Sequence, residues 1–141
     1  ELTVEHDPQP AFFKITLDSL RLLDHGAPGD IVLFRFEAAA LSLLGFMPRT
    51  ESCALCGAKL PARPAFSPRF GGALCAACGP RDPGAQSVSA GALRMMARLA
   101  EGAIPLESLN VDGRIGRELR AAFSLFWLNL FGRELRSARF L

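Results

Sequence analysis

The sequence predicts a mainly α-helical, bundle-like domain that carries an inserted four-cysteine zinc ribbon. Four segments combine apolar residues at helical spacing with recognisable helix ends. The segment in the middle of the chain, residues 49–81, is instead broken by proline and glycine and contains all four cysteines. With 141 residues, the chain can bury one hydrophobic core and support a small satellite module.

The N-terminal part of the chain predicts a pair of helices after a short linker. Residues 1–10 contain two prolines and are assigned to a linker, or to a severed connection with a preceding part of the protein. Residues 11–23 are apolar at too many positions for a single stripe, which predicts a largely buried helix. Asp30 is expected to cap a second helix over residues 31–44, which Gly45 ends. The short loop between the helices favours an antiparallel arrangement.

Two further helices are predicted after the cysteine segment. Ser87 or Ser89 can cap a helix that extends to about Ala100, because a side-chain oxygen there can accept a hydrogen bond from the first turn. Asp112 caps the last and longest helix, which the apolar periodicity carries to about Leu135.

The chain therefore divides into a helical domain and an insertion. The helical domain comprises residues 11–48 and 82–141, and the zinc-ribbon insertion comprises residues 49–81. Prolines between the cysteine pairs exclude a helix there. Two short strands, residues 65–67 and 72–74, are expected to flank a turn, as in zinc ribbons.

The four cysteines have the spacing of a four-thiolate zinc site. They form two C-x₂-C pairs separated by eighteen residues, and a glycine follows each pair: Cys53, Cys56, Cys75 and Cys78. Glycine at that place can adopt the positive φ that a tight turn around a metal ion often needs. Four protein ligands leave no open position for water or substrate, so we expect one structural zinc ion.

Other uses of the cysteines stay open at this stage. A mononuclear iron centre uses the same tetrahedral sulfur ligands. Two disulfides would suit a short secreted chain, but no signal peptide is visible. A redox switch at one pair would leave the other pair unexplained. Cysteines without a targeting signal favour a reducing, cytoplasmic location, and the longest apolar run, residues 36–46, is too short and too polar to span a membrane.

Basic residues outnumber acidic ones in two parts of the chain, residues 49–81 and 112–141. Most are arginines, whose guanidinium suits phosphate and carboxylate groups better than a lysine ammonium does. Solvated loop arginines, and cations that interact with a helix C-terminus, are the structural alternatives. The candidates for contact with nucleic acid or a protein partner are Arg63, Arg69, Arg114, Arg117, Arg120, Arg133, Arg136 and Arg139.

The order of several motifs resembles the C-terminal region of the RecO family of bacterial recombination mediators. The resemblance extends from about Ala11 to the end of the chain. The motifs that carry it are, in order, Leu44-Gly45-Phe46, Pro48, the first C-x₂-C-Gly pair, Phe66-Ser67-Pro68, Gly71-Gly72-Ala73-Leu74-Cys75 and Gly132-Arg133-Glu134-Leu135-Arg136-Ser137.

The resemblance implies a non-enzymatic function in DNA repair and homologous recombination. Members of the family join an N-terminal OB-fold, absent from this chain, to a helical domain with a zinc-finger region. They bind single- and double-stranded DNA and anneal complementary strands. With RecR, they load the recombinase RecA onto strands coated by single-strand binding protein. DNA, RecR and single-strand binding protein are therefore the expected partners, in the bacterial cytoplasm at the nucleoid, with no membrane and no small-molecule substrate.

Two further expectations concern the extent and independence of the domain. The first methionine is Met47, so we expect an N-terminal portion to precede Glu1. A second interpretation is a small zinc-ribbon module that binds nucleic acid or protein by itself. It predicts that residues 49–81 bind alone, whereas the RecO resemblance requires the helical body. The sequence offers no candidate active site for an enzyme, because neither a G-x-S-x-G nucleophile motif nor a phosphate-binding loop occurs.

Overall fold

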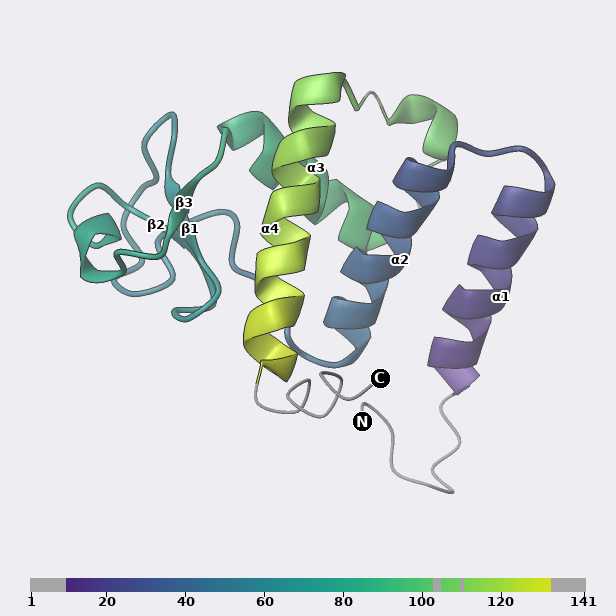
Figure 1. Cartoon of the computed structure of the whole chain (residues 1–141), viewed down its shortest axis with the longest axis horizontal. Helices are drawn as coiled ribbons and strands as arrows, with labels where there is room; N and C mark the ends of the chain where they lie inside the picture. Colours follow the sequence, from purple (N-terminus) through teal and green to yellow (C-terminus); the bar gives the residue numbers. More distant parts are fainter. Residues whose placement is uncertain (1–9, 103–104, 110, 133–141) are drawn as a thin grey trace.

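A computed structural model describes residues 10–102, 105–109 and 111–132. This part of the chain is mainly helical with one small sheet, as predicted (Figure 1). None of its helices has the length and apolarity needed to cross a membrane. The helices are α1 (Pro10–Asp24), α2 (Gly29–Leu43), α3 (Ala90–Glu101) and α4 (Gly113–Phe131), with short 3₁₀ turns η1 (Gly79–Arg81) and η2 (Leu106–Ser108); the strands are β1 (Ala65–Ser67), β2 (Gly72–Leu74) and β3 (Gln86–Ser87).

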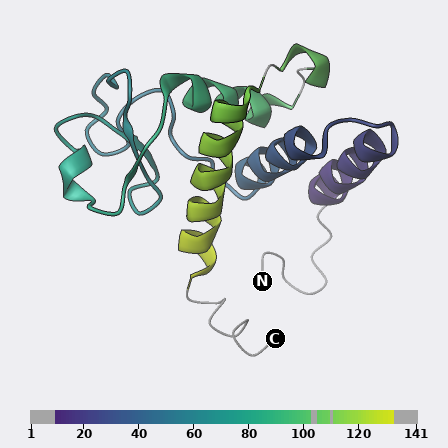
Figure 2. The same ribbon diagram turned by 45° about the horizontal axis from the view of Figure 1, so that its top comes forward.

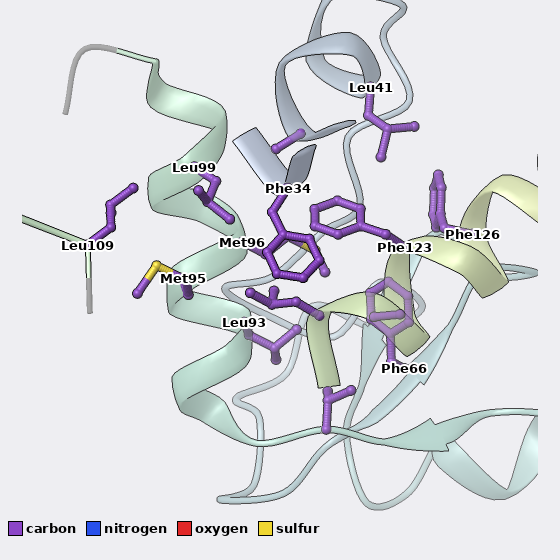
Figure 3. Packing of buried hydrophobic residues seen from close by; sticks show 14 of the residues in the cluster. Phe34, Leu41, Phe66, Leu93, Met95, Met96, Leu99, Leu109, Phe123 and Phe126 are labelled. Atoms are coloured by element: carbon purple, nitrogen blue, oxygen red, sulfur yellow. The ribbon is translucent and has the colours of Figure 1, made fainter. Parts of the chain in front are cut away.

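Helices α2, α3 and α4 enclose the hydrophobic core. Phe34 of α2 stacks on Phe123 of α4 with ring centroids 6.1 Å apart, and both side chains are buried. Met96 and Leu99 of α3 close the same cluster (Figure 3). Removal of these side chains from water is the main favourable contribution to the folding of the helical body.

The cysteine-containing ribbon packs against α4 on the side away from α1, as Figures 1 and 2 both show. Phe66 of β1 is fully buried, and its ring centroid lies 6.2 Å from that of Phe126 on α4. Phe66 and Ala73 belong to the same buried cluster as the helical core. The ribbon therefore shares its core with the helices.

Helix α1 is not the largely buried helix that its composition predicts. One of its faces contacts α2, where Phe12 and Phe36 meet edge to face with centroids 6.0 Å apart. None of its residues is buried, and Phe13 and Leu20 are 69% and 57% exposed. The prediction was wrong because apolar density shows how many sides of a helix favour burial, but not whether a neighbouring element covers them.

Two of the predicted helix caps are confirmed and one is wrong. Ser89 Oγ and Asp112 Oδ1 each accept a hydrogen bond from the backbone N–H three residues later, at 3.1 and 2.8 Å. Helix α2 instead begins at Gly29, directly after Pro28. Asp30 therefore lies inside the first turn, where its carboxylate still interacts favourably with the helix dipole.

The two predicted ribbon strands form an antiparallel hairpin with the expected residues. Phe66 of β1 lies opposite Ala73 of β2. The other edge of β1 pairs with β3, so β1 is the central strand of the sheet. Strand β3 was not predicted, because two residues are too few to show the alternation of a strand.

Candidate metal centre

The four cysteine thiols converge within the ribbon. All four Sγ atoms lie within 4.8 Å of one another, and those of Cys56 and Cys75 are 3.7 Å apart. Thiolates about 2.3 Å from a tetrahedral zinc ion are about 3.8 Å from one another. The four cysteines are free thiols rather than disulfides. Their positions could therefore hold one metal ion with four sulfur ligands.

Tight backbone turns shape both cysteine pairs. In the first pair, Gly57 has a φ of +74° and donates its N–H to the Cys53 carbonyl at 2.9 Å. This is the conformation expected from the sequence. In the second pair, Gly79 donates to the Cys75 carbonyl at 2.9 Å but lacks a positive φ. The expectation for Gly79 is wrong because η1 begins there and turns the chain without a left-handed residue.

A backbone hydrogen bond holds the first cysteine pair close to the second. The Ala54 N–H donates to the Ala73 carbonyl of β2 at 2.8 Å, and Cys75 follows β2 directly. Three of the four cysteines are buried together with Leu74, whereas Cys56 is exposed. The centre is thus closed on the protein side and open to solvent at one ligand.

The environment of the thiols favours a bound cation. Burial raises the pKa of Cys78 to about 12, and the neighbouring thiols add to this effect. Burial also opposes ionisation of Cys53, but hydrogen bonds from the backbone of Cys75, Cys56 and Leu55 lower its pKa to about 6. Four thiolates in this volume would repel one another, and a divalent cation offsets that repulsion. The donor set fits Zn²⁺, and the same sulfur tetrahedron is also compatible with iron.

A glycine permits the close approach of the chain that leads from α2 into the ribbon. The Arg49 N–H donates to the Gly71 carbonyl, and the Arg49 carbonyl accepts from the Ala73 N–H, both at 2.9 Å. Gly72, which lies between these contacts, has a φ of +151°. A Cβ at Gly72 would lie only 2.3 Å from the Arg49 carbonyl oxygen. Gly72, the second glycine of the Gly71-Gly72 motif, is therefore required by the packing of backbone on backbone.

A carboxylate on α4 joins the ribbon to the start of α3. Glu118 accepts hydrogen bonds from the backbone N–H of Ser89 at 3.1 Å and from its hydroxyl, and pairs with the Arg63 guanidinium at 3.2 Å. Burial opposes the charged form of Glu118, but the hydrogen bonds from Ser89 and the charge of Arg63 outweigh it and lower the pKa. Glu118 therefore connects three segments of the fold as a carboxylate.

Replacement of Glu118 by glutamine is expected to lower the free energy of unfolding by about 1–2 kcal/mol near neutral pH, because the hydrogen bonds lose their charged acceptor. The pKa of Glu118 is lower in the folded state than in the unfolded state. Its stabilisation is therefore complete above the ordinary glutamate pKa and is lost as the pH falls through the folded value. Urea unfolding of both proteins at a series of pH values should show their difference shrinking on acidification.

The matched control for this experiment is Glu101→Gln, which alters an exposed carboxylate at the end of α3. Its effect should stay within about 0.5 kcal/mol at every pH. A wild-type advantage over Glu118→Gln that grows as the pH falls would contradict the assignment of Glu118 as the stabilising charged form.

The candidate arginines differ in their surroundings. Arg63 forms the ion pair with Glu118, and the Arg69 guanidinium lies 5.3 Å from the centroid of the Phe70 ring, within the range of a cation–π interaction. Three candidates are exposed along α4: Arg114, Arg117 and Arg120. The remaining candidates lie outside the described residues: Arg133, Arg136 and Arg139.

Sequence reasoning missed the role of Glu118. Its partners lie 29 and 55 residues away along the chain. No local pattern marks such a long-range junction. The one available signal was that a single acid interrupts a basic helix surface.

Comparison with known proteins shows that the chain matches one family. Residues 1–139 match a family model described as "Recombination protein O C terminal". Relatives named "DNA repair protein RecO" include those of Anaeromyxobacter sp. (strain K), 37% identical over 143 residues, and Myxococcus xanthus (strain DK1622), 36% identical over 142 residues. Both alignments cover the whole of this chain and 56% of the relative, so the chain spans about half of their length. No solved structure matches the chain.

Proposed function

This chain belongs to the RecO C-terminal family, and from that premise we propose that it acts in DNA repair as a non-enzymatic recombination mediator domain. The match of residues 1–139 to the family model carries the proposal. In the full-length protein, the proposed activities are binding of single- and double-stranded DNA, annealing of complementary strands and, with RecR, loading of RecA. The four cysteines would hold one structural Zn²⁺, because no coordination position remains for a substrate.

The proposed DNA contact is the exposed surface of α4. Arg114, Arg117 and Arg120 follow one another at three-residue spacing and all face solvent. Burial raises the pKa of Glu37 on α2, and a hydrogen bond with Trp127 and, to a smaller extent, the charge of Arg120 oppose that rise. Neutralisation of phosphates by such arginines releases counterions and reduces the repulsion between two strands. Binding should therefore weaken steeply as salt is added.

The proposed contact for single-strand binding protein is a groove between α1 and α2. Its volume is about 480 Å³, and its apolar lining includes Ile15, Leu22 and Phe36. Arg21 and Arg35 also line this groove, together with one acidic residue, Asp18. The resemblance to the RecO family implies binding of the tail of single-strand binding protein, which is acidic and ends in phenylalanine. An arginine beside an apolar groove supplies the charge and the apolar surface that such a tail requires.

The contacts between ribbon and helices support a unit that acts as a whole. Phe66 packs against Phe126, and Glu118 binds both Arg63 and the cap of α3. A ribbon excised from these contacts would expose Phe66 and lose part of its core. The alternative of an independent zinc-ribbon module therefore has less support than a combined helical and ribbon domain.

The proposed function is tested by fluorescence anisotropy of labelled oligo(dT) with this chain across a salt series, with metal content determined on the same sample. We expect one zinc per chain and an affinity that falls steeply with salt. Substitution of the three α4 arginines by glutamine should make the salt dependence shallower. Zinc-loaded protein that does not bind the oligonucleotide would contradict DNA binding by this domain and leave it as a docking scaffold for protein partners.

A further inference from the structure

A second groove lies between the ribbon and α3. Its volume is about 460 Å³. Leu60 and Pro61 of the ribbon line one side, and Leu93 and Ala97 of α3 line the other. Figure 2 shows α3 leading directly out of the ribbon, so that the two elements meet at an angle. This groove contains neither the cysteine ligands nor the α4 arginines.

Two arginines form the α3 rim of this groove. Arg94 and Arg98 are both exposed, whereas the opposite face of α3 is buried in the core. They are four positions apart in the sequence, which places them on one helix face about 6 Å apart along the axis. No acidic residue in the described part of the chain forms an ion pair with either of them. Glu51, on the ribbon rim, is the one acid of the lining.

We propose that this groove binds the sugar–phosphate backbone of a nucleic-acid strand, with Arg94 and Arg98 on neighbouring phosphates. The inference rests on the proposed function and adds a second contact site to it, on a different helix from the α4 arginines. Two separate sites would let one chain hold two strands during annealing.

The lining favours a nucleic-acid backbone over an extended peptide. A peptide that adds to a sheet needs free backbone N–H groups on its partner. The ribbon side of this groove is not a strand and includes Pro61 and Pro64, which have no N–H to donate. The lining also has no aromatic side chain on which a base could stack, so binding should be independent of sequence.

The groove depends on a folded ribbon. The N–H of Val88 donates to the Pro64 carbonyl at 3.0 Å, and the N–H of Ala90 donates to the Ala62 carbonyl at 3.3 Å. These bonds hold the ribbon side of the groove against the first turn of α3. Metal binding at the four cysteines would thereby position a DNA-contact surface without touching the DNA.

The test compares two double variants of this chain in the oligo(dT) salt series. Arg94→Gln with Arg98→Gln removes the two groove arginines. Lys59→Gln with Arg81→Gln removes the same amount of charge from exposed ribbon positions outside the groove. We expect the groove variant to reduce the slope of log affinity against log salt by about 1.4, since each single-strand phosphate contact contributes about 0.7. The control should keep the wild-type slope, and oligo(dA) should give the same ranking.

The outcomes separate the two proposals. Wild-type chain that fails to bind any oligonucleotide would overturn the proposed function together with this inference. Salt-dependent wild-type binding with equal slopes in the two double variants would overturn the groove alone. The groove is likewise wrong if its arginines affect capture of a poly-glutamate peptide but not of the oligonucleotide. Circular dichroism of each variant must match the wild type, so that a changed slope does not reflect unfolding.

Discussion

Replacement of Cys56 by serine is expected to abolish stoichiometric zinc binding and to unfold the ribbon, while much of the helical circular dichroism signal is retained. Cys56 is the exposed ligand, so the substitution removes a thiolate with little loss of packing. Structural zinc stabilises small domains by on the order of 10 kcal/mol, and loss of one of four ligands should remove several kcal/mol of that. Zinc content, near- and far-ultraviolet circular dichroism and thermal unfolding would measure the effect.

Ala58→Ser is the matched control for this substitution. Ala58 is exposed in the same turn, and only its backbone carbonyl participates, as acceptor from the Cys53 N–H at 2.9 Å. It adds the same hydroxyl but leaves all four thiols in place. Cys56→Ser protein that keeps one zinc per chain and the wild-type melting temperature would refute the four-ligand site.

Replacement of Gly72 by alanine is expected to lower the free energy of unfolding by about 2–3 kcal/mol and to weaken zinc binding. Two effects combine at this position, because φ is +151° and the new Cβ would lie 2.3 Å from the Arg49 carbonyl oxygen. The colliding atom belongs to the backbone and cannot rotate away. Relief of this clash requires Arg49 to separate from β2. The separation would occur at Gly72, only three residues before the Cys75 ligand. Urea unfolding and competition with a zinc chelator would measure both effects.

Gly71→Ala separates the two effects. Gly71 also has a positive φ, +83°, but a Cβ there would meet no atom within 4 Å. Its cost should be limited to backbone strain, about 1 kcal/mol. Equal losses at Gly71 and Gly72 would show that the contact with Arg49 contributes nothing.

Local chemistry allowed much of this fold to be predicted from the sequence. Side-chain oxygens at Ser89 and Asp112 identified two helix starts because a cap acts within three residues. The C-x₂-C pairs indicated the metal centre for a similar reason, since each pair must bind through one short turn. Features that depend on a few neighbouring residues are therefore readable from the sequence.

Features that depend on distant segments were not predictable in this way. The exposure of α1 depends on the absence of a described neighbour over Phe13 and Leu20 rather than on its own composition. Glu118 acquires its partners only when the ribbon and α3 reach α4. The steric reason for Gly72 likewise appears only once Arg49 is placed beside it.

The small sheet holds the chain both before and after the cysteine pairs, and this has a consequence for the folding pathway. Helices α2 and α3 contact each other, although residues 44–89 separate them along the chain. Arg49 bridges to Gly72 of β2, and β3 pairs with β1, so one small sheet holds the chain as it leaves α2 and as it approaches α3. A long flexible loop would impose a closure entropy on the α2–α3 contact. A metal ion bound early at the four cysteines would order the ribbon and replace that loop with a rigid connector. The effective contact order of the helical core would then be lower, which favours faster folding.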